Sequence, residues 1–486
     1  MTTSPPRALA IDVGSTSVRT ALVDTQGRVT HVRQRRLEVN RPNPGEVELD
    51  ADEIVATVIA LGRQTLRDGG PAQALGITNQ RATTVVFDRV RGTPIGPALS
   101  WQDLRTVLAC LSLQGAGLRL APNQSATKAA YLVQASGREP DRLAMATIDT
   151  WIAWRLTEGR TFVTDRSNAA LTGLVSPPDF DWDPDVARLV GLQGVGLAAI
   201  VDSVGAVGTA TALDDLPITA LLGDQPASLL GQSIVDEGTK ITFGTGAMLN
   251  LVGGIAPPTE MVRYPSGCFP VVVRSQEGRA TWGLEGIVLS AGAALEALRD
   301  GLGLFSSIDD LEGLAASAPS SGGVVFVPAD LGLGTPHWDF GARSAFFGLS
   351  QATTRAHLAR AALEGVAHRG ADLVEAAEAQ TGRPIASVRI DGGMSANGLF
   401  VQCLADALGT PVEVSSEREA TTRGIGLLAL VGIGALDLST VAGLWRPARR
   451  VEPRLEASAR ATQRESWRWA ISHVRRTIPE LSEIDF

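Results

Sequence analysis

Hydrophobic and polar residues alternate in three short runs near the start of the chain, a period typical of β-strands. Within residues 7–39, the first run is apolar up to Ile11, and a Gly/Ser turn follows it. The second run extends through Val23, and the turn at residues 25–27 separates it from the third. This pattern predicts an antiparallel meander of three strands.

A helical spacing replaces the strand alternation from Asp52 to Arg67, where apolar residues recur three and four positions apart. The following segment, AQALGITNQRATTVVFD, returns to strand character, and helices and strands alternate from there on. Further helices are expected at about residues 352–381, 399–408 and 464–476. The mixture predicts an α/β fold.

A second strand, Gly/Thr turn and strand begins near residue 238 with GTKITFGTGAMLNLVGG, about 230 residues after the first. That interval is too long for a solenoid repeat and suits two similar domains that arose by duplication. We place the boundary near Val235, which gives domains 1–235 and 236–486 on either side of a central cleft. A chain of 486 residues also exceeds the roughly 250 to 300 residues that one hydrophobic core supports.

Composition narrows the functional class. The net charge of -9 argues against a nucleic-acid-binding surface, which would carry a basic stripe. The longest apolar stretch, residues 425–436, is interrupted by glycines and falls short of the roughly 20 residues of a membrane span. Cys110, Cys268 and Cys403 are too widely spaced for a disulfide framework or a metal knuckle. A cytoplasmic protein without membrane or nucleic-acid partners is expected.

Three glycine-containing turns could bind phosphate. The first, Gly14-Ser15-Thr16-Ser17, follows Asp12, whose carboxylate would face a metal ion while backbone N–H and hydroxyl groups surround a phosphate. The second includes Gly244 and Thr245, and the third, around Gly392 and Gly393, permits close approach to a planar ligand. Each could equally be an ordinary turn. Neither a GxGxxG fingerprint nor a GxxxxGK[ST] loop is present.

Polar residues at strand ends suggest where a substrate would bind. Asp224, followed by Gln225, comes after the apolar run ITALL, and a carboxylate there could take a proton from an alcohol during phosphoryl transfer. Arg81, in TNQRATT, could hold a hydroxylated substrate through its fork of donors. Trp101, in SWQD, could pack on the carbon face of that substrate. A structural role is the alternative for each of them.

Taken together and in order, these segments resemble the FGGY carbohydrate kinases, and within that family the glycerol kinase branch. The resemblance runs from about Ala8 to about Trp469. It rests on DVGSTSVR, GITNQRATT, SWQDLRT, TIDTWIAWRLTEGR, VTDRSNAALTGL, GDQPASLLGQ, TFGTGAM, LEGIVLSAGA, LGLGTPHWD, FFGLS and RIDGGMSANGLFVQCLADALG. Each motif alone is ambiguous, but so many collinear matches are not.

The resemblance implies two actin-like, ribonuclease H-like ATPase domains and an ATP-dependent, magnesium-supported phosphorylation of a small polyol or sugar. It implies Asp224 as catalytic base and Asp12 as magnesium support. The nucleotide positions that it implies are Gly14, Ser15, Thr16, Ser17, Arg19, Gly244, Thr245, Gly392, Gly393 and Asn397. The substrate positions that it implies are Arg81, Ala82, Trp101, Asn123, Asp224 and Gln225. A homo-oligomer is possible, and His337 in GTPHWD is expected to be structural.

Two substrate positions depart from the glycerol kinase pattern. Those kinases usually read NQRETT, whereas this chain has Ala82 in place of the Glu, and Asn123 stands where they have a Tyr, although Lys128 is retained. Losing one satisfied hydrogen bond costs about 1–3 kcal/mol. Both changes enlarge the site, so the substrate is expected to be a polyol or ketose other than glycerol, or glycerol held by altered contacts.

Two alternatives follow from the same residues. Ala82 and Asn123 motivate a pseudokinase that senses sugar or nucleotide, although Asp12, Asp224 and Thr245 are retained. An actin-like or chaperone-type ATPase would share the phosphate turns, but it would have no use for NQRAT, SWQD and GDQ as a substrate pocket. Dependence of ATP consumption on an added polyol separates both from a kinase.

Overall fold

The first half of the chain is built on a six-stranded mixed sheet, with strand order β13-β14-β5-β1-β2-β3. The computed structural model describes residues 5–177 and 180–485. The expected meander is present, because β1 pairs antiparallel with β2 and β2 with β3, whereas β5 and β14 run parallel to β1. The strands are β1 (Arg7–Val13), β2 (Ser17–Asp24), β3 (Val29–Arg36), β5 (Ala74–Asn79), β13 (Val204–Ala210) and β14 (Leu216–Gly223).

The second half contains a seven-stranded sheet, with strand order β17-β18-β16-β15-β21-β22-β23. Its central part repeats the first sheet, because β15, β16 and β18 form an antiparallel meander while β21 and β22 run parallel to β15. This shared topology is that of the actin-like ATPase fold. The strands are β15 (Gly238–Phe243), β16 (Ala247–Val252), β17 (Phe269–Gln276), β18 (Arg279–Val288), β21 (Val388–Asp391), β22 (Val412–Ser415) and β23 (Pro447–Val451).

A small sheet in the first half carries the loops expected to bind substrate, with strand order β4-β7-β6-β8. The loop that contains Arg81 joins β5 of the large sheet to β6 of the small one, and Trp101 follows β7. The small sheet therefore places these two loops beside the carboxyl end of β5. Its strands are β4 (Glu48–Leu49), β6 (Thr84–Asp88), β7 (Ala98–Leu99) and β8 (Leu143–Thr147).

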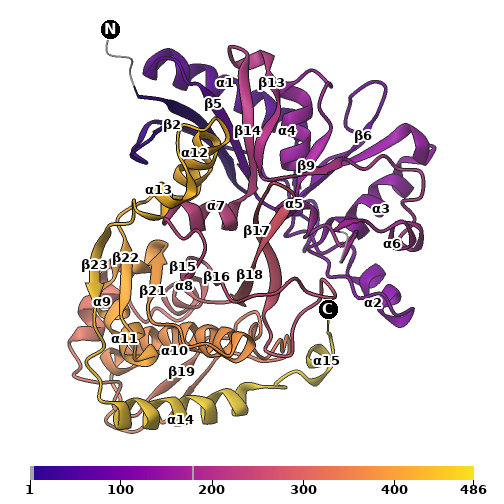
Figure 1. Cartoon of the computed structure of the whole chain (residues 1–486). Helices are drawn as coiled ribbons and strands as arrows, with labels where there is room; N and C mark the ends of the chain where they lie inside the picture. The colour runs from indigo at the N-terminus through magenta and orange to yellow at the C-terminus, as the bar shows by residue number, and fades with distance from the viewer. Residues whose placement is uncertain (1–4, 178–179, 486) are drawn as a thin grey trace.

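Helices cover the sheets much as the apolar spacing predicts. Helix α1 (Ala51–Gly69) begins where Asp50 caps it and buries Ile54, Val58 and Leu61. Helix α10 (Arg355–Thr381) crosses the lower half in Figure 1 and starts three residues later than expected, after the cap at Thr354. The other main helices are α3 (Ser125–Ser136), α4 (Ile148–Leu156), α7 (Asp224–Gly231), α11 (Gly398–Leu408), α12 (Ala420–Gly432) and α14 (Ala457–Val474).

Helix α12 comes late in the chain but packs on the sheet of the first half, where Figure 1 shows it in gold beside the indigo strands. It crosses α7 at very short range, because a Cβ at Gly424 would lie 1.8 Å from the Ala227 carbonyl oxygen. Likewise, a Cβ at Gly231 would lie 1.7 Å from the Ala420 oxygen. Only glycine permits this approach of two helix backbones. The apolar stretch at 425–436 is thus largely a buried helix, and the boundary near 235 stays a prediction.

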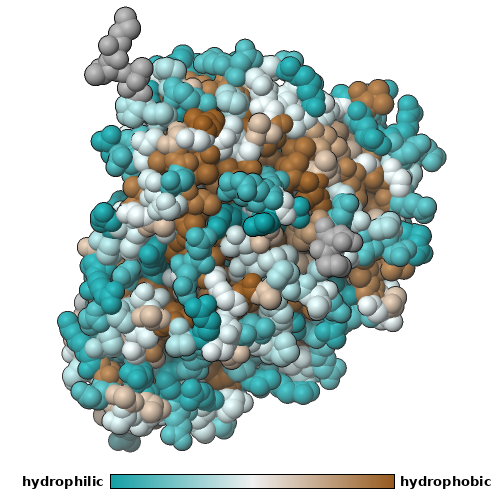
Figure 2. All heavy atoms as spheres, viewed as in Figure 1, coloured by the Kyte–Doolittle hydropathy of each residue, from teal (hydrophilic) through white to brown (hydrophobic). Residues whose placement is uncertain are grey.

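The surface in the same view is unevenly apolar. Hydrophobic residues reach it mainly in the upper half, around α12 and the strands beside it, whereas the lower half is mostly hydrophilic (Figure 2). Within the described ranges, no helix is both long and apolar enough to cross a membrane. Cys110, Cys268 and Cys403 are free thiols, and all three are buried.

Candidate active site

The turn between β1 and β2 has the form expected of a phosphate-binding hairpin. The Gly14 N–H donates to the Ser17 carbonyl oxygen at 2.9 Å, while Thr16 is exposed at the tip. Asp12, the penultimate residue of β1, is 7% exposed, and Arg19 on β2 lies 3.4 Å from its carboxylate. The turn therefore presents hydroxyl and backbone groups next to a carboxylate and a guanidinium.

The second phosphate turn joins β15 to β16 and is closed by the Gly244 N–H, which donates to the Gly246 carbonyl oxygen at 2.9 Å. The carbonyl oxygens of Gly244 and Thr245 accept N–H bonds from residues 291–293, so the turn is fixed against the start of the next helix. A Cβ on Gly244 would meet its nearest neighbour only at 4.0 Å, which leaves room for a ligand above the turn.

The third turn follows β21. Gly392 has φ +88°, and a Cβ there would lie 2.2 Å from the Phe243 carbonyl oxygen, so only glycine fits beside the second turn. A Cβ on Gly393 would meet nothing within 4 Å. Asn397 caps α11 by accepting the Phe400 N–H at 2.8 Å. Its carboxamide oxygen is therefore engaged in the helix cap, while its NH₂ group stays available to a nucleotide.

Asp224 lies where the two halves meet. It begins α7 directly after β14, and its side chain is 31% exposed. Arg81 Nε donates to Asp224 Oδ1 at 3.3 Å, and Arg81 Nη2 donates to Glu285 Oε2 at 2.6 Å. Burial raises the pKa of Asp224 above its ordinary value of 3.8, Arg81 opposes that rise, and Glu285 adds to it. Two carboxylates, one from each half, thus share one guanidinium.

A buried polar network fixes the strand end that carries Asp224. The Gly223 N–H donates to Ser167 Oγ at 2.9 Å, and Ser167 Oγ donates to Asp165 Oδ1 at 2.9 Å. Burial raises the pKa of Asp165, and it raises the pKa of the neighbouring Asp149 to about 7. Asp165 lies in the VTDRSNAALTGL segment and Asp149 in the TIDTWIAWRLTEGR segment, so these two segments support the strand end that precedes Asp224.

Lys240 is a further cation of the site and was not anticipated from the sequence. It is fully buried on β15, and its Nζ donates to Thr242 Oγ1 at 2.8 Å and to Gln225 Oε1 at 3.2 Å. Burial lowers its pKa, while Asp391 and Asp224 oppose that change. Lys240 therefore links the predicted substrate residue Gln225 to the strand that leads into the second phosphate turn.

The loops expected to bind substrate converge on one buried ammonium. Lys128 Nζ donates to the carbonyl oxygens of Ala82, Ser100 and Asn123 at 2.9, 3.0 and 3.0 Å. Ala82 has φ +60°, so this loop is held in a conformation that costs energy for a residue other than glycine. Trp101 follows Ser100 and is 38% exposed. Lys128 thus fixes the backbone on which Ala82, Trp101 and Asn123 are placed.

The ammonium of Lys128 makes the protein's stability depend on pH. Burial lowers the pKa of Lys128 to about 7 from 10.5, so between these values the unfolded chain binds a proton that the folded chain lacks. The free energy of unfolding should therefore rise with pH across that window, by at most about 1.4 kcal/mol per pH unit from this group. Urea unfolding of wild type and Lys128→Met at pH 7 and pH 10 gives the change in the free energy of unfolding with pH. The same change in both proteins would contradict the prediction.

The residues present fit a magnesium ion bound together with phosphate. Burial raises the pKa of Asp12 to about 7, Arg19 opposes the rise, and a cation would offset the cost of ionisation. Asp391 Oδ1 is buried without a hydrogen-bond partner, while its Oδ2 accepts from Gln232 at 2.7 Å. Within residues 5–177 and 180–485, no group of three or more His, Cys, Asp or Glu could cage a metal. Magnesium held by few carboxylates plus phosphate matches its usual preference.

A cavity of about 200 Å³ opens between Arg19 on β2 and the third turn. It is lined by residues from both halves, namely Arg19, Gln225, Ser228, Thr242, Asp391, Gly392, Arg418, Glu419, Ala420 and Thr421. Glu419 lies 3.0 Å from Arg19 Nε. The cavity therefore connects a predicted phosphate residue, a predicted substrate residue and a predicted nucleotide glycine.

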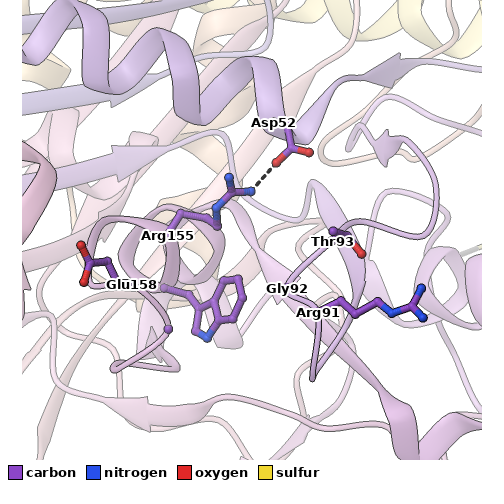
Figure 3. A pocket seen from close by; sticks show the side chains of 8 residues that line it. Asp52, Arg91, Gly92, Thr93, Arg155 and Glu158 are labelled. Carbon is purple, nitrogen blue, oxygen red and sulfur yellow. Dashed lines mark hydrogen bonds and ion pairs between the residues drawn. The ribbon is translucent and has the colours of Figure 1, made fainter.

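A larger hollow of about 410 Å³ lies elsewhere in the first half and includes none of the predicted site residues. Its walls include Trp154. Figure 3 shows the Arg155–Asp52 ion pair and Gly92, which also line it. It contains neither a phosphate turn nor a candidate base. Volume alone therefore does not identify the functional site.

Sequence reasoning missed the groups that the second half contributes to the Asp224 cluster. Glu285 lies in LEGIVLSAGA and Lys240 in GTKITFGTG, both within strands whose pattern is otherwise apolar. A charged residue at a buried strand position was the available signal.

Comparisons with known proteins identify the family of the chain. The models for the N-terminal and C-terminal domains of the FGGY family of carbohydrate kinases match residues 7–231 and 239–433. A glycerol kinase of Dechloromonas aromatica is 39% identical over 95% of this chain and 96% of its own length. A glycerol kinase of Rhodospirillum centenum is also 39% identical, over 98% of this chain and 99% of its own.

Solved structures give the same result for the fold. The crystal structure of Plasmodium falciparum glycerol kinase with ADP is similar at a TM-score of 0.89 and 25% identity, and the match covers 99% of both chains. The ligand-bound xylulose kinase of Lactobacillus acidophilus has a TM-score of 0.86 at 18% identity and covers 96% of this chain and 97% of its own. The chain therefore belongs to the FGGY family of carbohydrate kinases and is a phosphotransferase that acts on an alcohol group.

Proposed function

We propose that this enzyme transfers the γ-phosphoryl group of ATP to a hydroxyl of a small polyol or ketose, and that Asp224 takes the hydroxyl proton. The observation that supports this most directly is the position of Asp224. It begins α7 at the meeting of the two halves, shares Arg81 with Glu285, and is followed by Gln225 on the wall of the cavity that also contains Gly392. This position would let Asp224 act between the groups proposed to bind the hydroxyl and those proposed to bind phosphate.

In the proposed reaction the substrate hydroxyl lies beside the Asp224 carboxylate and within reach of the Arg81 guanidinium. An ordinary aspartate is a far weaker base than an alkoxide, so the proton moves late, as the oxygen loses charge to phosphorus. The raised pKa of Asp224 makes its carboxylate a stronger base than an ordinary aspartate. Arg19, the turn N–H groups and Thr245 would bind phosphate oxygens, and a magnesium ion held at Asp12 would neutralise charge on them.

The acceptor proposed is a polyol or ketose held differently from glycerol in the glycerol kinases. Support comes from Ala82, which offers no carboxylate, and from Asn123, which is exposed where those kinases have a Tyr. The carbonyl oxygens of both residues are tied to Lys128, so the side chains can vary while the loop backbone is kept. A wider, less acidic pocket suits an acceptor longer than glycerol.

A substrate panel tests this proposal. ADP release is measured with the wild-type protein, ATP and magnesium over glycerol, tetritols, pentitols and ketopentoses. The expected result is ADP formation that requires one of these acceptors, with a tetritol, pentitol or ketopentose giving a higher kcat/KM than glycerol. A protein that hydrolyses ATP equally without any acceptor, or that turns over none of them, would contradict the proposal.

A further inference from the structure

Glu285 is a buried carboxylate that belongs to the second half of the chain but reaches a residue of the first. It lies on β18 and is 6% exposed. Its partner across the sheet is Asn250 on β16, whose Nδ2 donates to Glu285 Oε2 at 3.0 Å. The same oxygen accepts from Arg81 Nη2 at 2.6 Å. The second sheet thus fixes Glu285, and Glu285 in turn contacts Arg81.

Arg81 depends on Glu285 more than on Asp224 for its orientation. Arg81 lies 2.6 Å from Glu285 and 3.3 Å from Asp224. The side chains of Arg81 and Glu285 are each only 7% exposed, whereas that of Asp224 is 31% exposed. A charge-assisted hydrogen bond between two desolvated groups holds its geometry more tightly than one open to water. Glu285 therefore sets the orientation of the Arg81 guanidinium. Asp224 accepts only the longer hydrogen bond from Arg81 Nε.

The loop that contains Arg81 has no carboxylate of its own that could orient the guanidinium. The next residue is Ala82, whose backbone oxygen is bound by Lys128. An arginine buried at 8% exposure without an anion would be costly, and among the described residues the only ion-pair partners of Arg81 are Asp224 and Glu285. If Asp224 is to accept a proton from substrate, Glu285 is the other carboxylate that pairs with Arg81.

We propose that Glu285 is a positioning residue for the substrate site, which aims Arg81 at the acceptor and links the acceptor's binding to the nucleotide half. This inference rests on the proposed function. Glu285 is held by Asn250 on β16, and β16 begins right after the second phosphate turn. Nucleotide bound at this turn would therefore contact the end of the strand that holds Glu285 and, through Glu285, Arg81. By linkage, acceptor and nucleotide each tighten the binding of the other.

The test compares wild type with Glu285→Gln, which keeps the shape of the side chain and an oxygen acceptor for Asn250 and Arg81 but removes the charge. The KM for the best acceptor of the panel is expected to rise about 10- to 100-fold, as for loss of one partner of a buried charge pair. The Kd of a non-hydrolysable ATP analogue measured without acceptor should stay within about threefold, because no phosphate turn is altered. Steady-state kinetics measures the acceptor KM, and calorimetry without acceptor measures the Kd of the analogue.

A second readout needs no turnover. Calorimetry gives the Kd of the acceptor with and without a non-hydrolysable ATP analogue. Wild type should bind the acceptor more tightly in the presence of the analogue, and Glu285→Gln should lose most of that difference. Asn250→Ala removes the support of Glu285 without removing a charge. It should show a smaller rise in acceptor KM and a smaller loss of the tightening by the analogue. This variant replaces Glu285→Gln in the test if Glu285→Gln does not fold.

The matched control is Glu413→Gln. Glu413 lies on β22 of the same sheet, has a side chain 13% exposed, and pairs with Arg450 at 2.9 Å and Arg389 at 3.7 Å. The Glu413→Gln variant should have a lower melting temperature. Its acceptor KM, and the tightening of acceptor binding by the ATP analogue, should be unchanged. If Glu285→Gln behaves like this control, the positioning role is overturned. A wild-type protein inactive on every acceptor would instead overturn the proposed function.

Discussion

Replacing Asp224 with Asn is expected to lower kcat by about 10²- to 10⁴-fold, the usual contribution of a general base. The amide has the same shape but cannot take the hydroxyl proton, and its contact with Arg81 loses the charge. Nucleotide affinity should be kept, because the phosphate turns do not include this residue. Acceptor-dependent ADP release and calorimetric binding of ADP measure the two quantities.

A surface aspartate supplies the control for that variant. Asp68→Asn removes an exposed ion pair with Arg33, and it should leave kcat and stability nearly unchanged. In the wild type the acidic limb of the pH–rate profile should lie above pH 3.8, since burial raises the pKa of Asp224 and the base works only when ionised. Turnover of Asp224→Asn at the wild-type rate would refute the assignment of the base.

Replacing Arg81 with Ala is expected to affect both stability and acceptor binding. It leaves Glu285 buried without its cation, which typically costs about 3–5 kcal/mol. It also removes the donors that would hold a hydroxyl, so acceptor KM should rise at least about 100-fold. Urea unfolding and acceptor-dependent ADP release measure the two effects.

Arg81→Lys serves as the graded partner of that variant. A lysine keeps the charge near Glu285 but cannot reach two carboxylates with a planar fork, so most of the stability should return while acceptor KM stays raised. An ATPase that works without an acceptor would be indifferent to both substitutions. Acceptor-independent ATP hydrolysis that survives Arg81→Ala unchanged would therefore contradict a kinase site at this position.

The sequence predicts the local architecture well where periodicity is clear. The alternation in residues 7–39 predicts three strands, and the structure has β1, β2 and β3 there. The helix expected at residues 464–476 instead spans Ala457–Val474, because the polar first turns give no apolar spacing to mark the start. The packing of α12 on the first sheet was not foreseen, since it joins residues far apart in the chain.

The candidate site was predictable only in part, for a similar physical reason. Glycine turns and strand-end carboxylates such as Asp12 and Asp224 can be recognised from their neighbours in the chain. Glu285 and Lys240 act on Arg81 and Gln225 of the other half, and only the folded structure brings these pairs together. The roles of the site residues in binding ATP and acceptor remain predictions for the experiments above.

The packing of α12 also bears on how the protein can be divided. This helix covers one face of the first sheet, where its apolar side chains meet small residues, including Ala8, Ala10 and Ala220. A fragment of residues 1–235 lacks α12 and would expose much of that face to water. Such a fragment should be insoluble alone and become soluble when co-expressed with residues 236–486. Split-protein complementation, rather than independent folding, is the behaviour to expect of the two halves.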